Sequence, residues 1–209
     1  MTDQLNELLE TMPAVAILRG VTEDKIVDVA DVILAAGIRL IEVPLNSPNA
    51  YDSITRLCSE RRGLGLFGCG TCTNLSELNQ VAQTGAELVV TPNVNPELIT
   101  TAIEWGLTPI PGYMTPTEAF TAYAAGARYL KLFPAANLGI NHYLALKEIL
   151  PDDVKTLAVG GVSAQSAKQW IKAGMSGIGV GSEIFKPNRD IDEIASRAMA
   201  VASALKAED

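Results

Sequence analysis

Short apolar segments recur along the chain, and a stretch with helical periodicity follows each of them. Five of these segments come directly after a glycine, which in most of them follows a small residue, as in "AAGIRLIEVPL" and "AAGARYLKLFP". A glycine there is typical of a helix C-terminus, and the apolar run after it is typical of a buried strand. Three further strands are predicted in "AVAILRG", "GLGLFGCG" and "KTLAVGG". The pattern therefore predicts eight strands that alternate with helices.

This alternation predicts the fold class. Strands that alternate with helices imply a parallel sheet, and eight such units close most naturally into a (β/α)8 TIM barrel. We expect residues 1–209 to form this single domain, with an additional N-terminal helix in "MTDQLNELLETMP". An open doubly wound sheet is the alternative, but "ILRGVTED" lacks the glycine fingerprint that usually follows its first strand. Helix starts are predicted at Thr22, Ser76, Asn95, Thr115 and Ser163.

Charge and hydropathy narrow the classes of partner. The chain has 24 acidic and 16 basic residues, a net charge of −8, and no segment that concentrates lysine or arginine. Nucleic acid is therefore not expected as a partner, whereas an anionic small molecule needs only a local positive pocket. The N-terminal helix does not resemble a signal peptide, and no apolar run approaches the roughly 20 residues that cross a bilayer. We expect a cytoplasmic protein with no membrane partner.

The cysteines do not predict a disulfide. There are three, Cys58, Cys69 and Cys72, in a chain without an export signal. The spacing of the last two matches a redox C-x-x-C pair, which remains the alternative interpretation. Such a pair needs a helix N-terminus directly after it to lower the pKa of a thiol, and the next helix is expected only near Ser76. We therefore interpret these cysteines as small buried residues.

Lys131 stands in the middle of the apolar run "YLKLFPAA". Side chains alternate along a strand, so Lys131 shares one face with Tyr129 and Phe133, and two leucines take the other. The leucines fit under the surrounding helices, which points Lys131 into the barrel, near the strand end where barrel enzymes keep their chemistry. Burying a charged amine costs several kcal/mol of desolvation unless the amine is paired with an opposite charge or is neutral. A lysine in this position is therefore either compensated or kept for a chemical function.

Glu42 and Arg19 are predicted to face the same interior. Alternation in "IRLIEVPLN" and "AVAILRG" places both side chains inward, near the upper rim. A structural salt bridge between Glu42 and Lys131 is one interpretation. The other is chemical, because a desolvated lysine with a lowered pKa can form a Schiff base with a ketone while a carboxyl group transfers protons. No metal or other cofactor is expected, since the only histidine is His142 and no carboxylates share a ligand spacing at strand ends.

Anion-binding groups are predicted at both ends of this site. Glycine pairs end the last two strands, where barrels commonly bind phosphate, although ordinary glycine turns are the alternative. The candidate phosphate-binding residues are Gly160, Gly161, Gly181 and Ser182. Thr71 in "GCGT" and Arg19 can bind a carboxylate. With the amine of Lys131 between the two ends, the residues predict a phosphorylated sugar acid as the substrate.

The motifs together resemble a known family. They occur in order along nearly the whole chain: "AILRG", "IEVPLNSP", "GCGT", "VVTPN", "PGYMTPTEA", "LKLFPA", "AVGGV" and "GVGS". They resemble the KDPG/KHG aldolase family of class I lyases, which cleave 2-keto-3-deoxy-6-phospho sugar acids to pyruvate and glyceraldehyde 3-phosphate. The resemblance implies a (β/α)8 barrel that associates as a homotrimer.

The resemblance also implies a role for individual residues. Lys131 corresponds to the Schiff-base lysine and Glu42 to the acid and base. Thr71 matches a contact to the pyruvate carboxylate. The residues that match the lining of the pyruvyl pocket are Pro92 and Phe133, and those that match the phosphate end are Gly160, Gly161 and Ser182.

Two departures bear on the substrate. Asn46 in "EVPLN" stands where the gluconate (KDPG) branch of the family has a carboxylate-binding arginine. We expect Asn46 to bind the carboxylate too, with Arg19 restoring the charge from the neighbouring strand. Val159 stands where the same branch has a threonine that could bind the substrate's C4 hydroxyl. Both departures resemble the galactonate (KDPGal) branch, which favours 2-keto-3-deoxy-6-phosphogalactonate. A KDPG-selective or bifunctional KDPG/KHG aldolase is the alternative; a phosphosugar epimerase or isomerase and a non-catalytic phosphate-binding barrel are remote ones.

Overall fold

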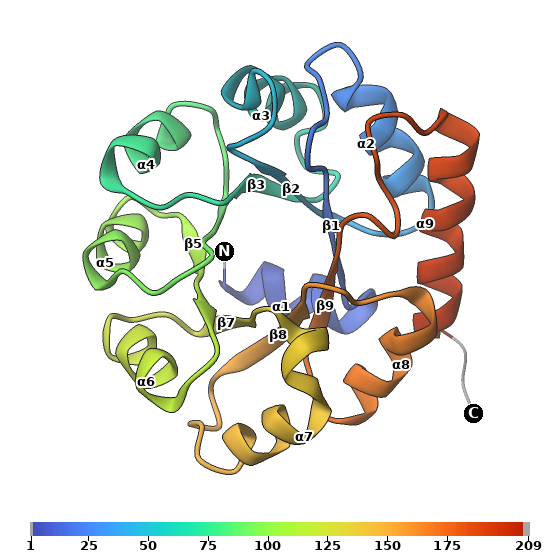
Figure 1. Cartoon of the computed structure of the whole chain (residues 1–209). Coiled ribbons are helices and arrows are strands. Elements are labelled where there is room, and N and C mark those ends of the chain that lie inside the picture. Colours follow the sequence, from blue (N-terminus) through green and yellow to red (C-terminus); the bar gives the residue numbers. More distant parts are fainter. Residues whose placement is uncertain (1, 207–209) are drawn as a thin grey trace.

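Parallel strands curve into a nearly closed barrel surrounded by helices (Figure 1), in a computed structural model that describes residues 2–206, with side chains from residue 4 onward. The sheet order is β5-β4-β3-β2-β1-β9-β8-β7-β6, and every neighbouring pair is parallel. The strands are β1 (Ala14–Ile17), β2 (Leu40–Pro44), β3 (Leu66–Gly70), β4 (Leu88–Val90), β5 (Thr108–Ile110), β6 (Gly112–Tyr113), β7 (Tyr129–Leu132), β8 (Lys155–Val159) and β9 (Gly177–Val180). The predicted α/β barrel is confirmed.

The fifth predicted strand, in "EWGLTPIPGYM", is divided in two at Pro111. β5 pairs with β4 on one side, and β6 pairs with β7 on the other. Proline has no N–H to donate to a sheet ladder, which explains the break. The carbonyl oxygen of Pro111 still accepts a 2.8 Å hydrogen bond from the backbone N–H of Lys131. The two short strands therefore take the place of one barrel strand.

Helices follow the strands around the outside, and an additional helix lies at the N-terminus. They are α1 (Thr2–Thr11), α2 (Ile26–Ala35), α3 (Ala50–Glu60), α4 (Leu75–Ala82), α5 (Pro96–Glu104), α6 (Pro116–Ala124), α7 (Ala135–Lys147), α8 (Ala164–Lys172) and α9 (Ile191–Lys206). Leu5 and Leu9 of α1 pack into the barrel interior, so this helix covers the end opposite the carboxyl ends of the strands. Within residues 2–206, no helix is long and apolar enough to cross a membrane.

Three of the predicted helix starts are confirmed, and two are wrong. The confirmed N-cap residues, each with a side chain that accepts a backbone N–H of the first turn, are Asn95, Thr115 and Ser163. α4 begins at Leu75 rather than after Ser76, because the side chain of Asn74 caps it. α2 begins at Ile26, because the residues after Thr22 form a turn whose N–H groups bond back to the Thr22 carbonyl.

Two apolar layers result from the alternation along the strands. The inner layer includes Val15, Leu40 and Leu157 and fills the barrel. Leu130 and Leu132 belong to the outer layer, between the sheet and the helices. These positions confirm the predicted side-chain directions in β7, and they leave Lys131 facing inward. Separately, the cysteines are free thiols: Cys69 and Cys72 are buried and Cys58 is partly buried.

Candidate active site

Lys131 lies inside the barrel near the carboxyl end of β7. Its side chain is 6% exposed, and its neighbours across the sheet are Gly112 and Leu157. The Nζ atom lies 5.0 Å from the centroid of the Phe133 ring, on the same side of the chain. The lysine is therefore buried against apolar and aromatic surface, where an amine loses most of its hydration.

Glu42 reaches the same space from β2 and is 4% exposed. Its Oε2 atom has no hydrogen-bond partner among the residues that the structure describes. Gly70 makes room for this carboxylate, since a Cβ atom built on Gly70 would lie 1.4 Å from Oε2. The sequence analysis gave this glycine no such role, although a glycine within a strand is a known sign of close approach.

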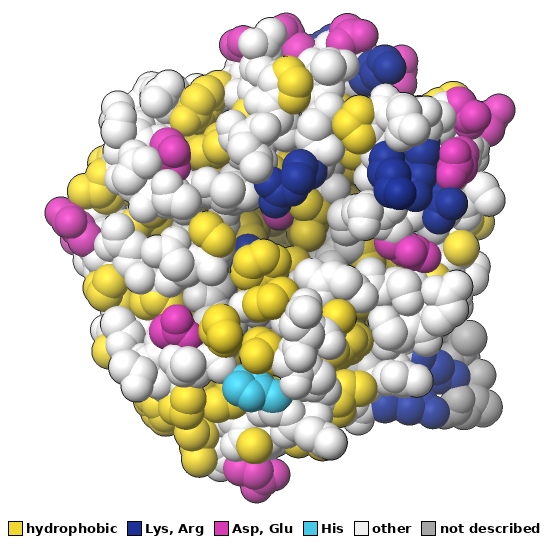
Figure 2. Space-filling model, viewed as in Figure 1, with side chains coloured by type: hydrophobic (Ala, Val, Ile, Leu, Met, Phe, Trp, Pro, Cys, Tyr) yellow, Lys and Arg dark blue, Asp and Glu magenta, His cyan; other side chains and the backbone are white. Residues whose placement is uncertain are grey.

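Glu42 and Lys131 share one small cavity, which the inward side chains of several strands enclose. Its other lining residues are Val15, Ile17, Val90, Ile110, Leu157, Val159 and Gly179. Figure 2 shows the face above it, where hydrophobic side chains gather around a hollow over the barrel. The predicted convergence of Glu42 and Lys131 is therefore present in the structure.

Burial sets the protonation of both groups. It raises the pKa of Glu42 to about 7, although the charges of Lys131 and Arg19 act to lower it. It lowers the pKa of Lys131 to about 8, with Glu42 opposing this shift and Arg19 adding to it. Among the contacts of the described residues, no ion pair within 4.0 Å joins Glu42 to Lys131. This arrangement favours the chemical interpretation over a structural salt bridge, because both groups exchange protons near neutral pH.

A polar cluster lies at the rim beside the cavity. The Nη1 atom of Arg19 donates to Asn46 Oδ1 at 2.5 Å, and Nη2 donates to Thr71 Oγ1 at 3.4 Å. The loops that carry the first two residues are also joined, since Gly20 N donates to Ser47 Oγ at 2.9 Å. Thr71 has a φ of 60°, which is uncommon for a β-branched residue. The structure thus brings together the three predicted carboxylate-binding residues.

The predicted phosphate-binding glycines have a packing role of their own. Gly160 and Gly161 have φ values of 95° and 72°. A Cβ atom on Gly160 would lie 3.2 Å from the Phe133 ring, and one on Gly161 would lie 2.6 Å from Ala136 Cβ. A glycine pair is therefore required for this loop to pass the segment after β7, whether or not it binds an anion.

The remaining predicted site residues follow the carboxyl ends of two other strands. Gly181 lies after β9, where an added Cβ atom would only reach ordinary contact distance from Ile17, and Ser182 beside it is exposed. Pro92 follows β4, and its carbonyl oxygen lies so close to Gly112 that a Cβ atom built there would be 2.5 Å from it. His142 instead contacts the loop before α6, with Nε2 2.7 Å from the Met114 carbonyl oxygen.

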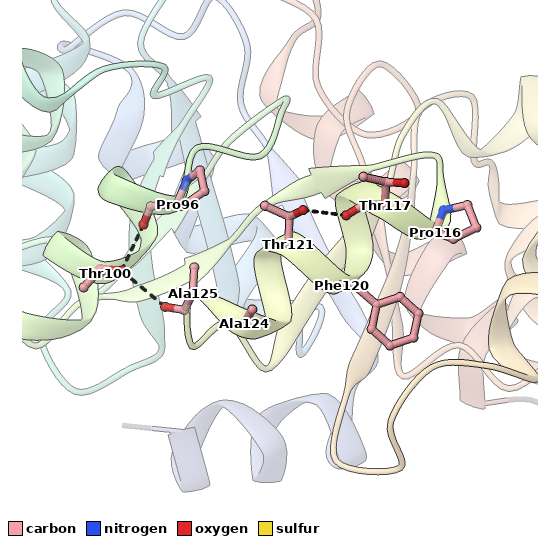
Figure 3. Close-up of a pocket in the computed structure, with 8 residues that line it drawn as sticks. All are labelled: Pro96, Thr100, Pro116, Thr117, Phe120, Thr121, Ala124 and Ala125. Carbon is pink, nitrogen blue, oxygen red and sulfur yellow. Dashed lines mark hydrogen bonds between the residues drawn. The ribbon is translucent and has the colours of Figure 1, made fainter.

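A larger groove lies on the outside of the barrel, between α5 and α6 (Figure 3). It is lined by prolines, alanines, threonines and one phenylalanine: Pro96, Thr100, Pro116, Thr117, Phe120, Thr121, Ala124 and Ala125. None of these residues has a basic, acidic or strongly nucleophilic side chain. The groove therefore lacks the groups that bond cleavage requires, and the cavity with Lys131 is the candidate active site.

Comparisons with known proteins show what the chain as a whole is similar to. The model of the KDPG and KHG aldolase family matches residues 5–197. The chain is 38% identical over 195 residues to the 2-dehydro-3-deoxy-6-phosphogalactonate aldolase of Escherichia coli (strain K12), covering 93% of this chain and 95% of that enzyme. The native KDPGal structure matches with a TM-score of 0.90 at 39% identity, covering 92% of this chain and 94% of that one. A chain of a cube-shaped, highly porous protein cage, designed by fusing symmetric oligomeric domains, matches with the same TM-score and identity, covering 92% of this chain and 72% of that one.

Proposed function

The chain belongs to the KDPG and KHG aldolase family, and from that premise we propose that it cleaves 2-keto-3-deoxy-6-phosphogalactonate to pyruvate and glyceraldehyde 3-phosphate. It is a carbon–carbon lyase. One observation carries the proposed mechanism: the buried amine of Lys131, with its pKa lowered to about 8, faces the same cavity as the carboxyl group of Glu42. An amine that loses its proton near neutral pH is a nucleophile toward a ketone.

The proposed reaction begins when the neutral amine of Lys131 attacks the C2 carbonyl of the substrate. Loss of water gives an iminium ion, which accepts the electron pair of the C3–C4 bond when that bond breaks. Glu42 removes the proton of the C4 hydroxyl, so the departing fragment leaves as an aldehyde. Protonation of the resulting enamine at C3 and hydrolysis of the imine then release pyruvate and restore Lys131. A carboxyl group with a pKa of about 7 can both accept and return these protons.

The two ends of the substrate are assigned to the two sides of the mouth. We propose that Arg19, Asn46 and Thr71 bind the carboxylate, since they already contact one another through the guanidinium group. Pro92 and Phe133 line the pyruvyl pocket. The glycine loops after β8 and β9 bind the phosphate through backbone N–H groups and one hydroxyl: Gly160, Gly161, Gly181 and Ser182. Val159 lines the same cavity as Glu42 and Lys131, and this position supports its proposed role in distinguishing the C4 epimers.

The test is pyruvate release measured side by side on the two C4 epimers of the phosphorylated sugar acid. Faster turnover of the galactonate epimer supports the assignment of Val159 and of the Arg19–Asn46 pair. Comparable or reversed rates would replace it with a bifunctional or gluconate-selective aldolase. Sodium borohydride with pyruvate present should inactivate the enzyme by reducing the imine on Lys131; activity that survives this treatment would contradict the Schiff-base mechanism.

We further propose that the chain associates as a homotrimer. The family resemblance supports this, as does the match to a cage built from symmetric oligomeric domains. Phe120, in the groove between α5 and α6, is 41% exposed, and association would bury apolar surface of this kind. Sedimentation equilibrium of the purified protein should give three times the mass of one chain, and a monomer mass at micromolar concentration would contradict the proposal.

A further inference from the structure

An acidic side chain lies between the two loops that the proposed function assigns to phosphate. Glu183 follows Ser182 directly, and its Oε1 atom accepts a 3.4 Å hydrogen bond from the backbone N–H of Ala164. Ala164 is the first residue of α8, three positions after Gly161. The carboxylate of Glu183 therefore bridges the loop after β9 and the loop after β8 at the proposed phosphate end.

The position that this carboxylate occupies is one that favours an anion. The first N–H groups of a helix have no partner within it, and the helix dipole places positive potential there. In α8, the N-cap side chain of Ser163 accepts the N–H of Ser166, and the Ser166 hydroxyl accepts the N–H of Ser163. Neither of these two side chains accepts the N–H of Ala164, and the carboxylate of Glu183 is its acceptor.

Two arginines bind the backbone carbonyl group of Glu183. The Nη1 atoms of Arg189 and Arg197 donate to the Glu183 carbonyl oxygen at 3.1 and 3.4 Å. The Nε atoms of both arginines pair with Oε1 of Glu193, at 3.2 and 2.8 Å. The guanidinium groups therefore hold the main chain at position 183, which keeps the Glu183 side chain within reach of α8.

We propose that Glu183 is a specificity-determining residue that weakens the binding of phosphate at this end of the site. This inference rests on the proposed function, which places the phosphate between the same two loops. An ionised carboxylate and a phosphate dianion are both hydrogen-bond acceptors only, so they compete for the Ala164 N–H. They also repel each other at short range. Binding of the phosphorylated end therefore requires Glu183 to release α8, which lowers the enzyme's preference for a phosphorylated over an unphosphorylated sugar acid.

The test is the affinity of inorganic phosphate for the wild type and for Glu183→Gln, measured by calorimetry on the full chain. Removing one negative charge beside the anion should tighten phosphate binding by about three- to tenfold, with a smaller gain at high salt. The KM for the phosphorylated substrate should fall by a similar factor while kcat stays unchanged. Glu183→Ala removes the competing acceptor as well and should give at least the same gain.

Glu118→Gln is the matched control, because Glu118 also accepts backbone N–H groups at a helix start, that of α6. α6 and α8 lie on different sides of the barrel (Figure 1), so this variant should leave phosphate affinity unchanged. Unchanged or weaker phosphate binding in both Glu183 variants, with their thermal unfolding intact, would overturn the inference. Pyruvate release by the wild type tests the proposed function separately. If the wild type releases no pyruvate, the phosphate-binding measurements still test the role of Glu183.

Discussion

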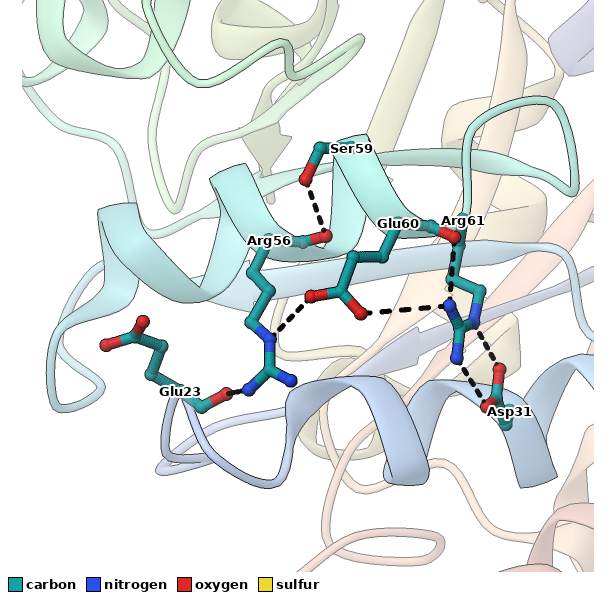
Figure 4. A network of polar contacts seen from close by, with 6 residues as sticks. All are labelled: Glu23, Asp31, Arg56, Ser59, Glu60 and Arg61. Atoms are coloured by element: carbon teal, nitrogen blue, oxygen red, sulfur yellow. Dashed lines mark hydrogen bonds and ion pairs between the residues drawn. The ribbon is translucent and has the colours of Figure 1, made fainter.

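Ionisable side chains are arranged in opposite ways on the outer helices and inside the barrel. Figure 4 shows the outer arrangement, where α2 and α3 are joined by a chain of polar contacts. Arg61 binds Asp31 through two nitrogen atoms, at 2.5 and 2.7 Å. Arg56 binds Glu60 at 2.6 Å and the carbonyl oxygen of Glu23 at 2.8 Å. Every charge drawn there except the Glu23 carboxylate has an opposite charge within reach. The paired side chains stay 20–47% exposed to water, and such pairs contribute little to stability.

Inside the barrel, Glu42 and Lys131 are almost completely removed from water, and the Oε2 atom of Glu42 has no hydrogen-bond partner within the part of the chain that the structure describes. Burial shifts the pKa of each group toward its neutral form. The paired charges on the outer helices therefore stabilise the protein slightly. The incompletely paired Glu42 and Lys131 are instead the groups suited to a reaction. The predictions below test the contrast, beginning with the substitutions inside the barrel.

Lys131→Met should abolish pyruvate release, with a loss of at least about 10³-fold in kcat/KM, because no other group in the cavity can form the imine. Borohydride with pyruvate should then leave no covalent adduct detectable by mass spectrometry. Lys155→Met is the control, since Lys155 lies at the opposite end of its strand, β8. An adduct that persists in Lys131→Met would assign the nucleophile to another lysine.

Gly70→Ala should lower kcat by about a hundredfold, because the new methyl group occupies the position of the Glu42 carboxylate, and loss of a general acid or base costs about 10²–10⁴-fold. The imine with pyruvate should still form, since Lys131 is unchanged. In a Glu42→Ala background the methyl group has free space, so adding Gly70→Ala should cause little further loss. Equal losses in both backgrounds would show that Gly70 acts independently of Glu42.

Glu42→Gln should change how stability depends on pH. The pKa of Glu42 is raised from 4.5 to about 7, so the folded wild type holds this proton more tightly than the unfolded chain and loses stability as the pH rises through that window. Glutamine removes this penalty. Urea unfolding at pH 5 and pH 7.5 should therefore show the variant gaining about 2–3 kcal/mol over the wild type between the two conditions. A constant difference would mean that Glu42 titrates normally.

Val159→Thr should shift the choice between C4 epimers by up to about tenfold toward the gluconate form, since one neutral hydrogen bond is worth about 0.5–1.5 kcal/mol. The measurement is the ratio of kcat/KM values for the two epimers. Val90→Thr supplies the control, because Val90 lines the same cavity from β4. A similar shift in both variants would place the discrimination in the polarity of the cavity rather than at position 159.

Arg61→Ala should produce the smallest effect, a loss of less than about 1 kcal/mol in the free energy of unfolding, because the pair with Asp31 lies at the surface. The loss should shrink further at high salt, and kcat/KM should stay at the wild-type value. Urea unfolding at low and high ionic strength checks this. A loss above about 2 kcal/mol would show that the outer network stabilises the barrel more than its exposure implies.

The sequence by itself determined which residues face the barrel interior. The two-residue period of a strand fixes the face of each side chain, so the inward direction of Lys131 and Glu42 followed from the apolar residues beside them. The alternation of strands and helices likewise determined the parallel barrel. These inferences succeeded because they depend on neighbours within a few positions along the chain.

Only the tertiary structure decided what those inward residues meet. Arg19 contacts Asn46 and Thr71, which lie 27 and 52 positions away, because the loops after three adjacent strands converge at one rim. Gly70 makes room for Glu42 because of the register between β2 and β3. Local periodicity carries no information about register or about the depth of burial. The shifted pKa values of Glu42 and Lys131 therefore had to come from the folded molecule.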